Sequence, residues 1–197
     1  MKAIIVVLVV LLVVVGGLLM WGVGVNNRLV AGGEGVNAAW AQVQTVYQRR
    51  ADLIPNLVET VKGFAAQERT VLEEVTRARA SASQMTLTPE MLNDPNALRK
   101  FQEAQAQLGG ALSRLLVTVE RYPDLKSNQN FLALQSQLEG TENRIAVERR
   151  RYNEVVQGYN TQIRLFPASL VAGFRGFKEK AYFEAAPGSE TAPKVKF

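Results

Sequence analysis

The fold is decided first by residues 3–25, which read AIIVVLVVLLVVVGGLLMWGVGV and contain no charged side chain. As a helix this stretch would be about 34 Å long, slightly more than the hydrocarbon core of a bilayer at about 30 Å. A helix of this length and composition can cross a membrane once. We therefore predict a transmembrane anchor over residues 1–27.

A cleaved signal peptide is the competing interpretation of these residues, because such peptides also begin with a positive charge such as Lys2. Two features favour a retained anchor. The apolar run is longer than the usual apolar region of a signal peptide, and no Ala-x-Ala pattern closes it. Trp21 also lies near the end of the run, where an indole would reach the headgroup level.

The residues after the anchor predict a linker and then long amphipathic helices. Residues 28–35 contain Gly32 and Gly33 and are predicted to form the linker. Apolar side chains then recur at steps of three and four over about 35–85, 95–122 and 127–166, a pattern typical of helices that bury one face. Connectors of only several residues favour antiparallel neighbours.

These patterns predict an all-α protein in which an N-terminal transmembrane helix is followed by a long antiparallel up-down helical bundle. The bundle would cover residues 36–183, with three long helices and a short C-terminal helix. Residues 184–197 contain Pro187, Gly188 and Pro193 and are predicted to form a flexible tail.

Pro55 interrupts the first of the long helical patterns. A proline inside a helix removes one hydrogen bond and clashes with the preceding turn, so it can kink the helix. Alternatively, Asp52 caps a second helix and Pro55 lies in its first turn. The sequence leaves both possibilities open.

Composition excludes several kinds of chemistry. The chain has no cysteine and no histidine, so disulfides, thiolate ligands and the commonest general base are absent. A carboxylate-only metal site around Glu139, Glu142 and Glu148 is disfavoured, because the related helical-bundle metal sites also use histidines. We predict no catalytic residue, no metal and no cofactor. The net charge of +5 favours anionic lipid as a neighbour rather than nucleic acid.

Two groups of polar residues are candidates for a structural role. Arg49, Arg50 and Asp52 precede Pro55 and Asn56, and we interpret them as charge pairs around a helix irregularity. The dipeptide Tyr-Asn occurs at Tyr152 and again seven residues later at Tyr159. Both pairs would lie on one face of a helix, as buried tyrosines whose polar tips need partners and set the helix register.

The segment from Arg49 to Phe64, RRADLIPNLVETVKGF, resembles the signature of the LemA family. The resemblance extends over Ala39-Trp40 and further blocks downstream, so it covers essentially everything after the predicted linker. It implies a bacterial single-pass membrane protein with an antiparallel helical bundle and no agreed catalytic residues. Many members have a histidine where this chain has Gln67, which weakens a metal or proton-switch role there. The matching positions that we carry over as family-motif residues are Arg49, Arg50, Asp52, Pro55, Asn56, Tyr122, Pro123, Glu142, Asn143, Tyr152 and Asn153.

The function predicted from the sequence is a non-enzymatic scaffold or adaptor of the bacterial cell envelope, anchored in the inner membrane by a single pass. The expected partners are the lipid bilayer, further copies of the chain in a homo-oligomer, and another membrane protein. The side of the membrane that holds the bundle stays open. The alternative is an envelope sensor that binds a metal or anionic lipid through Glu142, Asn143 and the arginines 149–151.

Overall fold

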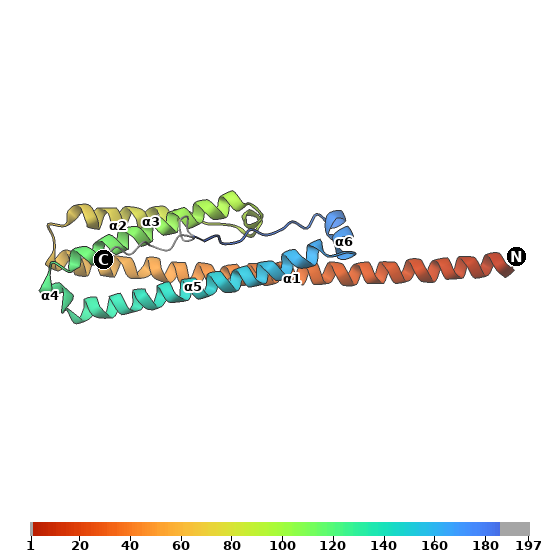
Figure 1. Cartoon of the computed structure of the whole chain (residues 1–197), viewed down its shortest axis with the longest axis horizontal. Coiled ribbons are helices and arrows are strands. Elements are labelled where there is room, and N and C mark those ends of the chain that lie inside the picture. The colour runs from red at the N-terminus through yellow and green to blue at the C-terminus, as the bar shows by residue number, and fades with distance from the viewer. Residues whose placement is uncertain (1, 186–197) are drawn as a thin grey trace, which may run out of the picture.

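The computed structural model describes residues 2–185, and this part of the chain is helical with no strand (Figure 1). It begins with one very long helix, α1 (Lys2–Phe64). The other elements are α2 (Arg69–Gln84), the 3₁₀ helix η1 (Pro89–Asn93), α3 (Pro95–Val119), α4 (Pro123–Lys126), α5 (Gln129–Arg164) and α6 (Ala168–Arg175). The all-α bundle is confirmed. The predicted tail lies outside the described residues except for 184 and 185.

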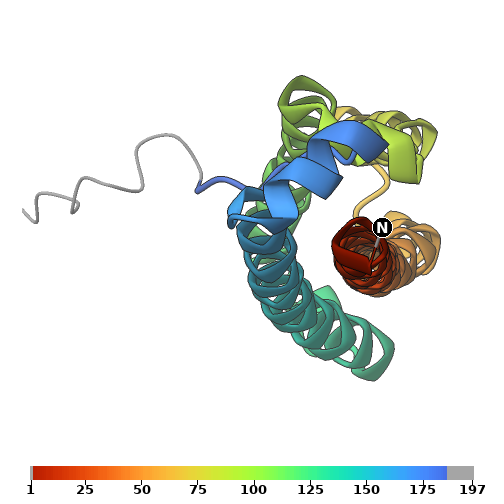
Figure 2. The same cartoon turned by 90° about the vertical axis from the view of Figure 1, so that its right-hand side faces the viewer.

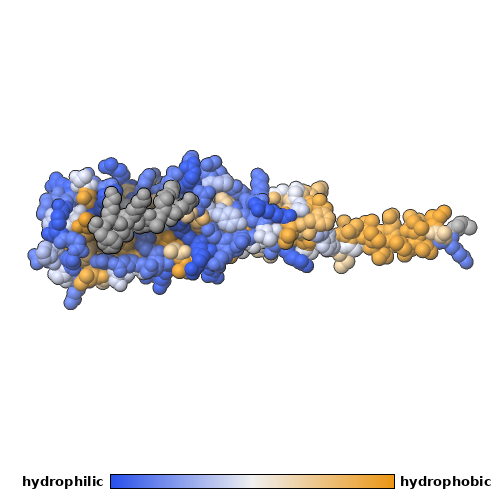
Figure 3. All heavy atoms as spheres, viewed as in Figure 1, coloured by the Kyte–Doolittle hydropathy of each residue, from blue (hydrophilic) through white to orange (hydrophobic). Residues whose placement is uncertain are grey.

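The N-terminal part of α1 projects from the bundle as a bare apolar helix (Figure 1, Figure 3). Its large side chains are exposed from Ile4 to Val23. Within the described residues it is the one helix long and apolar enough to cross a membrane. Within residues 2–185 these side chains stay largely exposed, and an apolar environment such as lipid would suit them.

The predicted linker over residues 28–35 is wrong, because α1 continues through it without a break. Leu29 is already buried in the core. Gly32 lies so close to α5 that an added Cβ would approach Tyr159 Cδ2 to 3.1 Å. The glycine therefore permits close helix packing instead of a turn. As a result the bundle begins where the bare apolar helix ends.

The first long helix predicted for the bundle is two helices, so the bundle has four long helices instead of three. The chain leaves the helix after Phe64, with the Ala65 amide bonded to the Val61 carbonyl and the Glu68 amide to the Ala65 carbonyl. It then turns back so that α2 buries Leu72 and Val75 on α1. Gly63, a weak helix former, stands just before this turn. The apolar pattern is continuous across residues 65–68, but the apolar faces of α1 and α2 are buried against each other only if the chain turns there.

The predictions for the later helices are close to the structure. α3 starts at Pro95, the first residue of the predicted range, and the Asp94 side chain accepts a hydrogen bond from the Asn96 amide at 2.9 Å. Pro123 follows the end of α3 and itself opens the short α4. α5 is capped by Asn128, whose side chain accepts from the Phe131 amide at 3.1 Å.

Viewed along its axis, α1 lies in the concave side of an arc formed by the other helices (Figure 2). α1 contacts α5 on one side and α2 on the other, and α2 pairs with α3. After α6 the chain turns at Gly176, which has a left-handed φ of 75°. Residues 177–185, which we call the strap, then run back along the bundle as an extended segment (Figure 1).

Candidate functional site

The predicted site residues do not converge on one site. Some of them belong to three clusters at different levels of the bundle: around Arg50 in the middle, around Tyr122 at the end far from the bare helix, and around Tyr152 under the strap. Each cluster joins elements that are distant in the sequence. Their contacts show what each cluster does.

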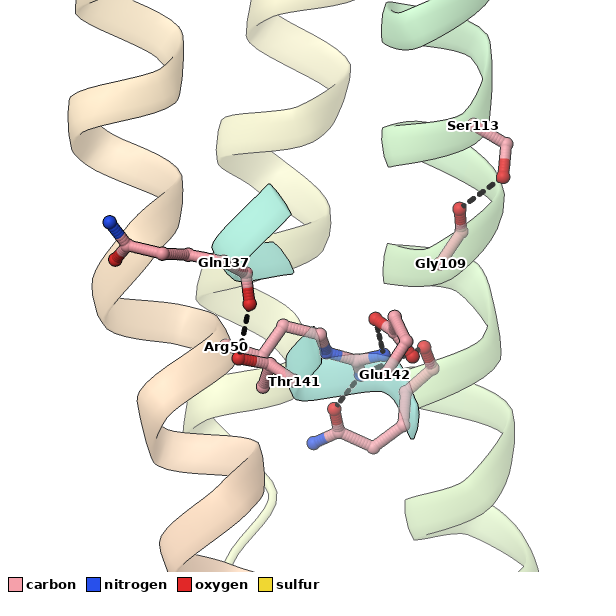
Figure 4. A network of polar contacts seen from close by, with 7 residues as sticks. Arg50, Gly109, Ser113, Gln137, Thr141 and Glu142 are labelled. Carbon is pink, nitrogen blue, oxygen red and sulfur yellow. Dashed lines mark hydrogen bonds and ion pairs between the residues drawn. The ribbon is translucent and has the colours of Figure 1, made fainter. Parts of the chain in front are cut away.

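The middle cluster is built on Arg50 of α1 (Figure 4). This residue is almost completely buried, with 3% of its surface exposed. From α1 its guanidinium donates to Glu142 Oε1 of α5 at 2.9 Å and to the backbone carbonyl of Gln105 of α3 at 3.2 Å. A further hydrogen bond reaches the Gln105 side chain. The guanidinium also lies 5.1 Å from the centre of the Tyr47 ring. One side chain thus ties three helices together.

This arrangement suits arginine in particular, because the planar fork can reach several acceptors at once and stack on an aromatic ring. Gln105 is itself buried, and its amide donates to the Ala82 carbonyl of α2 at 3.5 Å. Tyr47 is buried beside the arginine, and burial raises the pKa of its hydroxyl. The cluster therefore holds a charge that is paired and hydrogen-bonded inside the bundle, a structural arrangement.

Arg49 and Asp52, next to Arg50 in the sequence, remain at the surface. Asp52 accepts a hydrogen bond from Gln48 one turn earlier, at 2.7 Å. Both line a groove between α1, α2 and α3. The predicted pairing of these charges with one another is not observed: Arg50 pairs with Glu142 of α5, and Asp52 accepts its hydrogen bond from the neutral Gln48.

Pro55 lies inside α1, which continues past it. Proline has no amide hydrogen, so the carbonyl four residues earlier, that of Ala51, loses its helical donor. Arg79 of α2 replaces that donor: its Nε donates to the Ala51 carbonyl at 2.8 Å. The helix break proposed at Asp52 is therefore wrong, since Asp52 is in mid-helix and a neighbouring helix satisfies the carbonyl that the proline leaves free.

Asn56 is exposed on α1, and its carbonyl accepts the Thr60 hydroxyl at 2.8 Å. Its side chain has no role in the three clusters. Pro123 serves as the first residue of α4. Neither residue contributes a functional group to a shared site.

The distal cluster joins the α1–α2 turn to the end of α3. The Tyr122 hydroxyl donates to Glu68 Oε1 at 2.7 Å and accepts from Gln67 Nε2 at 3.0 Å. Arg121 pairs with the same carboxylate at 3.1 Å. The hydrogen bond to Glu68 raises the pKa of Tyr122. Gln67, the position that departs from the family pattern, is thus part of a hydrogen-bonded link between two chain turns.

The third cluster holds the strap by its main chain. The Asn153 side chain both donates to the Phe183 carbonyl and accepts from the Phe183 amide, each at 2.9 Å. Asn160 makes the same pair of bonds with Lys180, also at 2.9 Å. Each asparagine amide therefore completes both backbone hydrogen bonds of one strap residue.

The spacing of the two asparagines matches the spacing of the strap. Seven residues of helix rise by about 10.5 Å. Three residues of extended chain, from Lys180 to Phe183, cover about 10 Å. The two asparagines thus fix the register of an antiparallel extended segment against α5, whereas the sequence pattern predicted that the tyrosines would set the register of the helix.

The tyrosine of the first pair completes this cluster. The Tyr152 hydroxyl donates to the Ala181 carbonyl at 3.1 Å, and burial raises its pKa. Phe183 is buried against Tyr152 with ring centres 5.3 Å apart, and Trp40 of α1 lies 6.0 Å from Phe183. Arg149 covers the outer face of Phe183 at 4.7 Å. The strap is therefore anchored by one aromatic side chain and by its own peptide groups.

The residues of the alternative metal or lipid sensor are dispersed by the fold. Glu142 is engaged by Arg50, while Asn143 is exposed. Arg149 donates to the Glu184 carbonyl of the strap, and Arg150 lies 4.0 Å from Glu154. Over residues 2–185, no three His, Cys, Asp or Glu side chains come together in a way that could hold a metal ion.

Sequence reasoning missed Gln105 and Arg79. Both are polar residues on helices that otherwise follow an amphipathic pattern. Gln105 stands on the apolar face of α3, between Phe101 and Leu108, and a polar residue in such a position signals a buried partner. No sequence signal identifies Arg79, because its acceptor is a main-chain carbonyl.

The fold and its clusters define a class of protein: a helical bundle, held together by internal polar contacts, on a bare N-terminal apolar helix long enough to cross a membrane. The chain belongs to the LemA family, whose model matches residues 39–197. This match confirms the family resemblance of the motif residues. LemA is not a known enzyme family. No curated protein matches the chain at a significant level.

Proposed function

We propose that this protein is a non-enzymatic scaffold or adaptor of the bacterial cell envelope, held in the inner membrane by a single pass of α1. Its bundle acts by self-association or by binding another membrane protein. One observation carries the proposal: the bare apolar part of α1 and the central helix of the bundle are the same unbroken helix. The position of the bundle is therefore coupled directly to the anchor.

The internal contacts support a structural role for the bundle. Arg50, Asn153 and Asn160 all bond within the chain and join elements that are distant in the sequence. Substrate chemistry needs polar groups directed toward an open site. Here the buried polar groups are directed toward helices and the strap instead, so they stabilise a rigid shape.

The outer surface of the bundle offers side chains for contacts between chains. Val117 on α3 and Leu132 and Val147 on α5 are large apolar residues that stand exposed, with polar or charged residues one turn away along each helix. Apolar contacts ringed by polar groups are common where proteins associate. The contacts that Glu142 and Arg149 make inside the chain give the alternative, a metal or lipid sensor built on them, less support.

The test uses the full chain, which has no cysteine. Leu132→Cys supplies a single labelling site on the exposed side of α5. Donor-labelled and acceptor-labelled chains are mixed in lipid vesicles, and the mass of the particle is measured in detergent. We expect energy transfer that an excess of unlabelled chain abolishes, and a mass above that of one chain.

A second measurement, in native membranes, tests whether the bundle binds another membrane protein. Photocrosslinking from the same position should join the chain to itself or to one defined membrane protein. A monomeric particle with no energy transfer and no crosslinked product would exclude both self-association and binding to another membrane protein. A mature chain that begins near residue 30 would exclude the anchor.

A further inference from the structure

We propose that α6, with Leu165 and Phe166 before it, is a second membrane contact: an amphipathic foot that lies in the bilayer interface and seats the bundle on the membrane. The inference rests on the proposed anchoring by α1. It adds a lipid-binding surface formed by residues far from the anchor in the sequence.

The first observation is the position of α6. Arg175 Nε donates to Asn26 Oδ1 at 3.0 Å, which ties α6 to α1 where the bare helix enters the bundle. A shallow hollow between the two helices is lined by Leu19 and Val23 of α1 and by Leu170 and Phe174 of α6. If residues 3–25 cross the bilayer, Leu19 and Val23 lie about 8–14 Å from its centre. Both residues therefore lie in the outer half of the acyl layer, whose boundary with the headgroups is about 15 Å from the centre.

The second observation is the direction of α6. In the view along the molecule, α1 and α5 are seen end on, whereas α6 is seen along its length (Figure 2). α6 therefore runs across the axis of α1. When α1 crosses the membrane, α6 lies roughly in the membrane plane, as interfacial helices do.

The third observation is an exposed apolar face. The inner side of α6 is covered, because Ala172 is buried and Val171 packs against the core. Four large apolar side chains are nevertheless exposed: Leu165 at 58%, Phe166 at 79%, Leu170 at 64% and Phe174 at 91%. The apolar colouring of the bare helix continues onto this end of the bundle (Figure 3). A surface in water gains nothing from such exposure, whereas burial in lipid stabilises each side chain.

The fourth observation is the charge around this face. The only charged residue in 3–33 is Arg28, and the only ones in 165–178 are Arg175 and Lys178. All three are basic. Acidic side chains begin further from the bilayer, at Glu34 and Glu179, and Glu179 is paired with Arg164. A basic rim beside an apolar face fits anionic phospholipid headgroups.

The observations together specify one occupant, the bilayer surface, because the apolar face continues the surface of the membrane-spanning helix. The experiment measures depth in the membrane from single thiols introduced into the cysteine-free full chain. Gly173→Cys places an environment-sensitive fluorophore on the exposed side of α6, where an added Cβ meets nothing within 4 Å. Leu12→Cys marks the anchor, and Val117→Cys, which is 72% exposed on α3, marks the bundle surface.

The chain is reconstituted in phosphatidylcholine vesicles containing phosphatidylglycerol, with nitroxide groups attached either near the headgroup or deep in the acyl chain. We expect the Gly173→Cys label to lose most of its emission to the shallow nitroxide and the Leu12→Cys label to the deep one. The Val117→Cys label should lose none. The additional double change Leu170→Ser and Phe174→Ser should abolish quenching at position 173, and omitting phosphatidylglycerol should weaken it.

The outcomes separate this inference from the proposed anchoring. If position 12 is quenched and position 173 behaves like position 117, α6 does not contact lipid and the foot is excluded while the anchor stands. If the label at position 173 is shielded from water but no nitroxide quenches it, protein covers this face, which also excludes the lipid contact. If position 12 is not quenched, the anchor itself fails.

Discussion

Replacing Arg79 tests whether a side chain from α2 compensates for the proline in α1. Arg79→Ala removes the hydrogen bond that its Nε donates to the Ala51 carbonyl at 2.8 Å. Hydrogen bonds from charged groups contribute about 1.5–3 kcal/mol, and we expect the lower value here, about 1.5 kcal/mol, because Arg79 is partly exposed. Arg77→Ala on the exposed side of the same helix is the matched control, with an expected cost below about 0.5 kcal/mol.

The informative measurement is a double-mutant cycle with Pro55→Ala. Alanine restores an amide hydrogen at position 55, so the Ala51 carbonyl regains its helical donor and needs Arg79 less. In that background the cost of Arg79→Ala should fall to about 0.5 kcal/mol, a coupling of about 1 kcal/mol. Pro55→Ala alone should stabilise the bundle.

Thermal unfolding of the four full-length chains in detergent, followed by circular dichroism, measures the cycle. For a protein of this size, 1 kcal/mol corresponds to about 2–4 °C in Tm. Equal effects of Arg79→Ala in both backgrounds would refute the compensation, since the two donors would then act independently.

Three further changes test the clusters. Arg50→Ala should lower stability by about 3 kcal/mol, because it removes the hydrogen bonds of a buried guanidinium to the Gln105 carbonyl and to the partly exposed Glu142. Arg49→Ala should lower it by less than about 0.5 kcal/mol; denaturant unfolding compares the two, and equal effects would contradict the buried role of Arg50. Asn160→Ala removes two hydrogen bonds to Lys180, which contribute about 1 kcal/mol each. Hydrogen exchange at the Ala181 amide should therefore be faster than in the control Gln157→Ala, on the order of tenfold or more. Unchanged exchange would show that other contacts hold the strap. The pKa of Tyr122 is raised above its usual value of 10.0, so the stability that its hydroxyl contributes is present below that pH and is lost as the pH rises through the folded-state pKa. Tyr122→Phe should therefore reduce the fall in Tm at alkaline pH. Parallel curves of Tm against pH for the two chains would exclude the link to Glu68.

The sequence predicts most of the helices because their apolar positions repeat at helical spacing. It fails at Gly32 and at the turn after Phe64 for one physical reason. A glycine in a helix can mark a turn or a close approach of another helix, and only the position of Tyr159 distinguishes the two. Similarly, the apolar pattern is continuous across the turn at residues 65–68, because both helices bury the same kind of face.

The candidate clusters are predicted less well, because their partners are often main-chain atoms. The repeated Tyr-Asn pattern indicated buried tyrosines with polar tips and a register role, but nothing in the sequence marks the carbonyl and amide of Lys180 as the partners of Asn160. Arg50 was recognisable as a motif residue. Its partners Gln105 and Glu142 are 55 and 92 residues away, and their proximity is a product of the fold.

With α1 crossing the membrane as proposed, the continuity of this helix would make the molecule a lever whose pivot lies in the lipid. From Val25 to Phe64 the helix extends about 60 Å beyond the apolar segment. A change of about 10° in the tilt of the membrane-spanning part, well within the range that such helices adopt, would sweep the far tip near α4 sideways by about 10 Å. A thinner or thicker bilayer would thus be converted into a lateral displacement deep in the surrounding solution, far from any lipid.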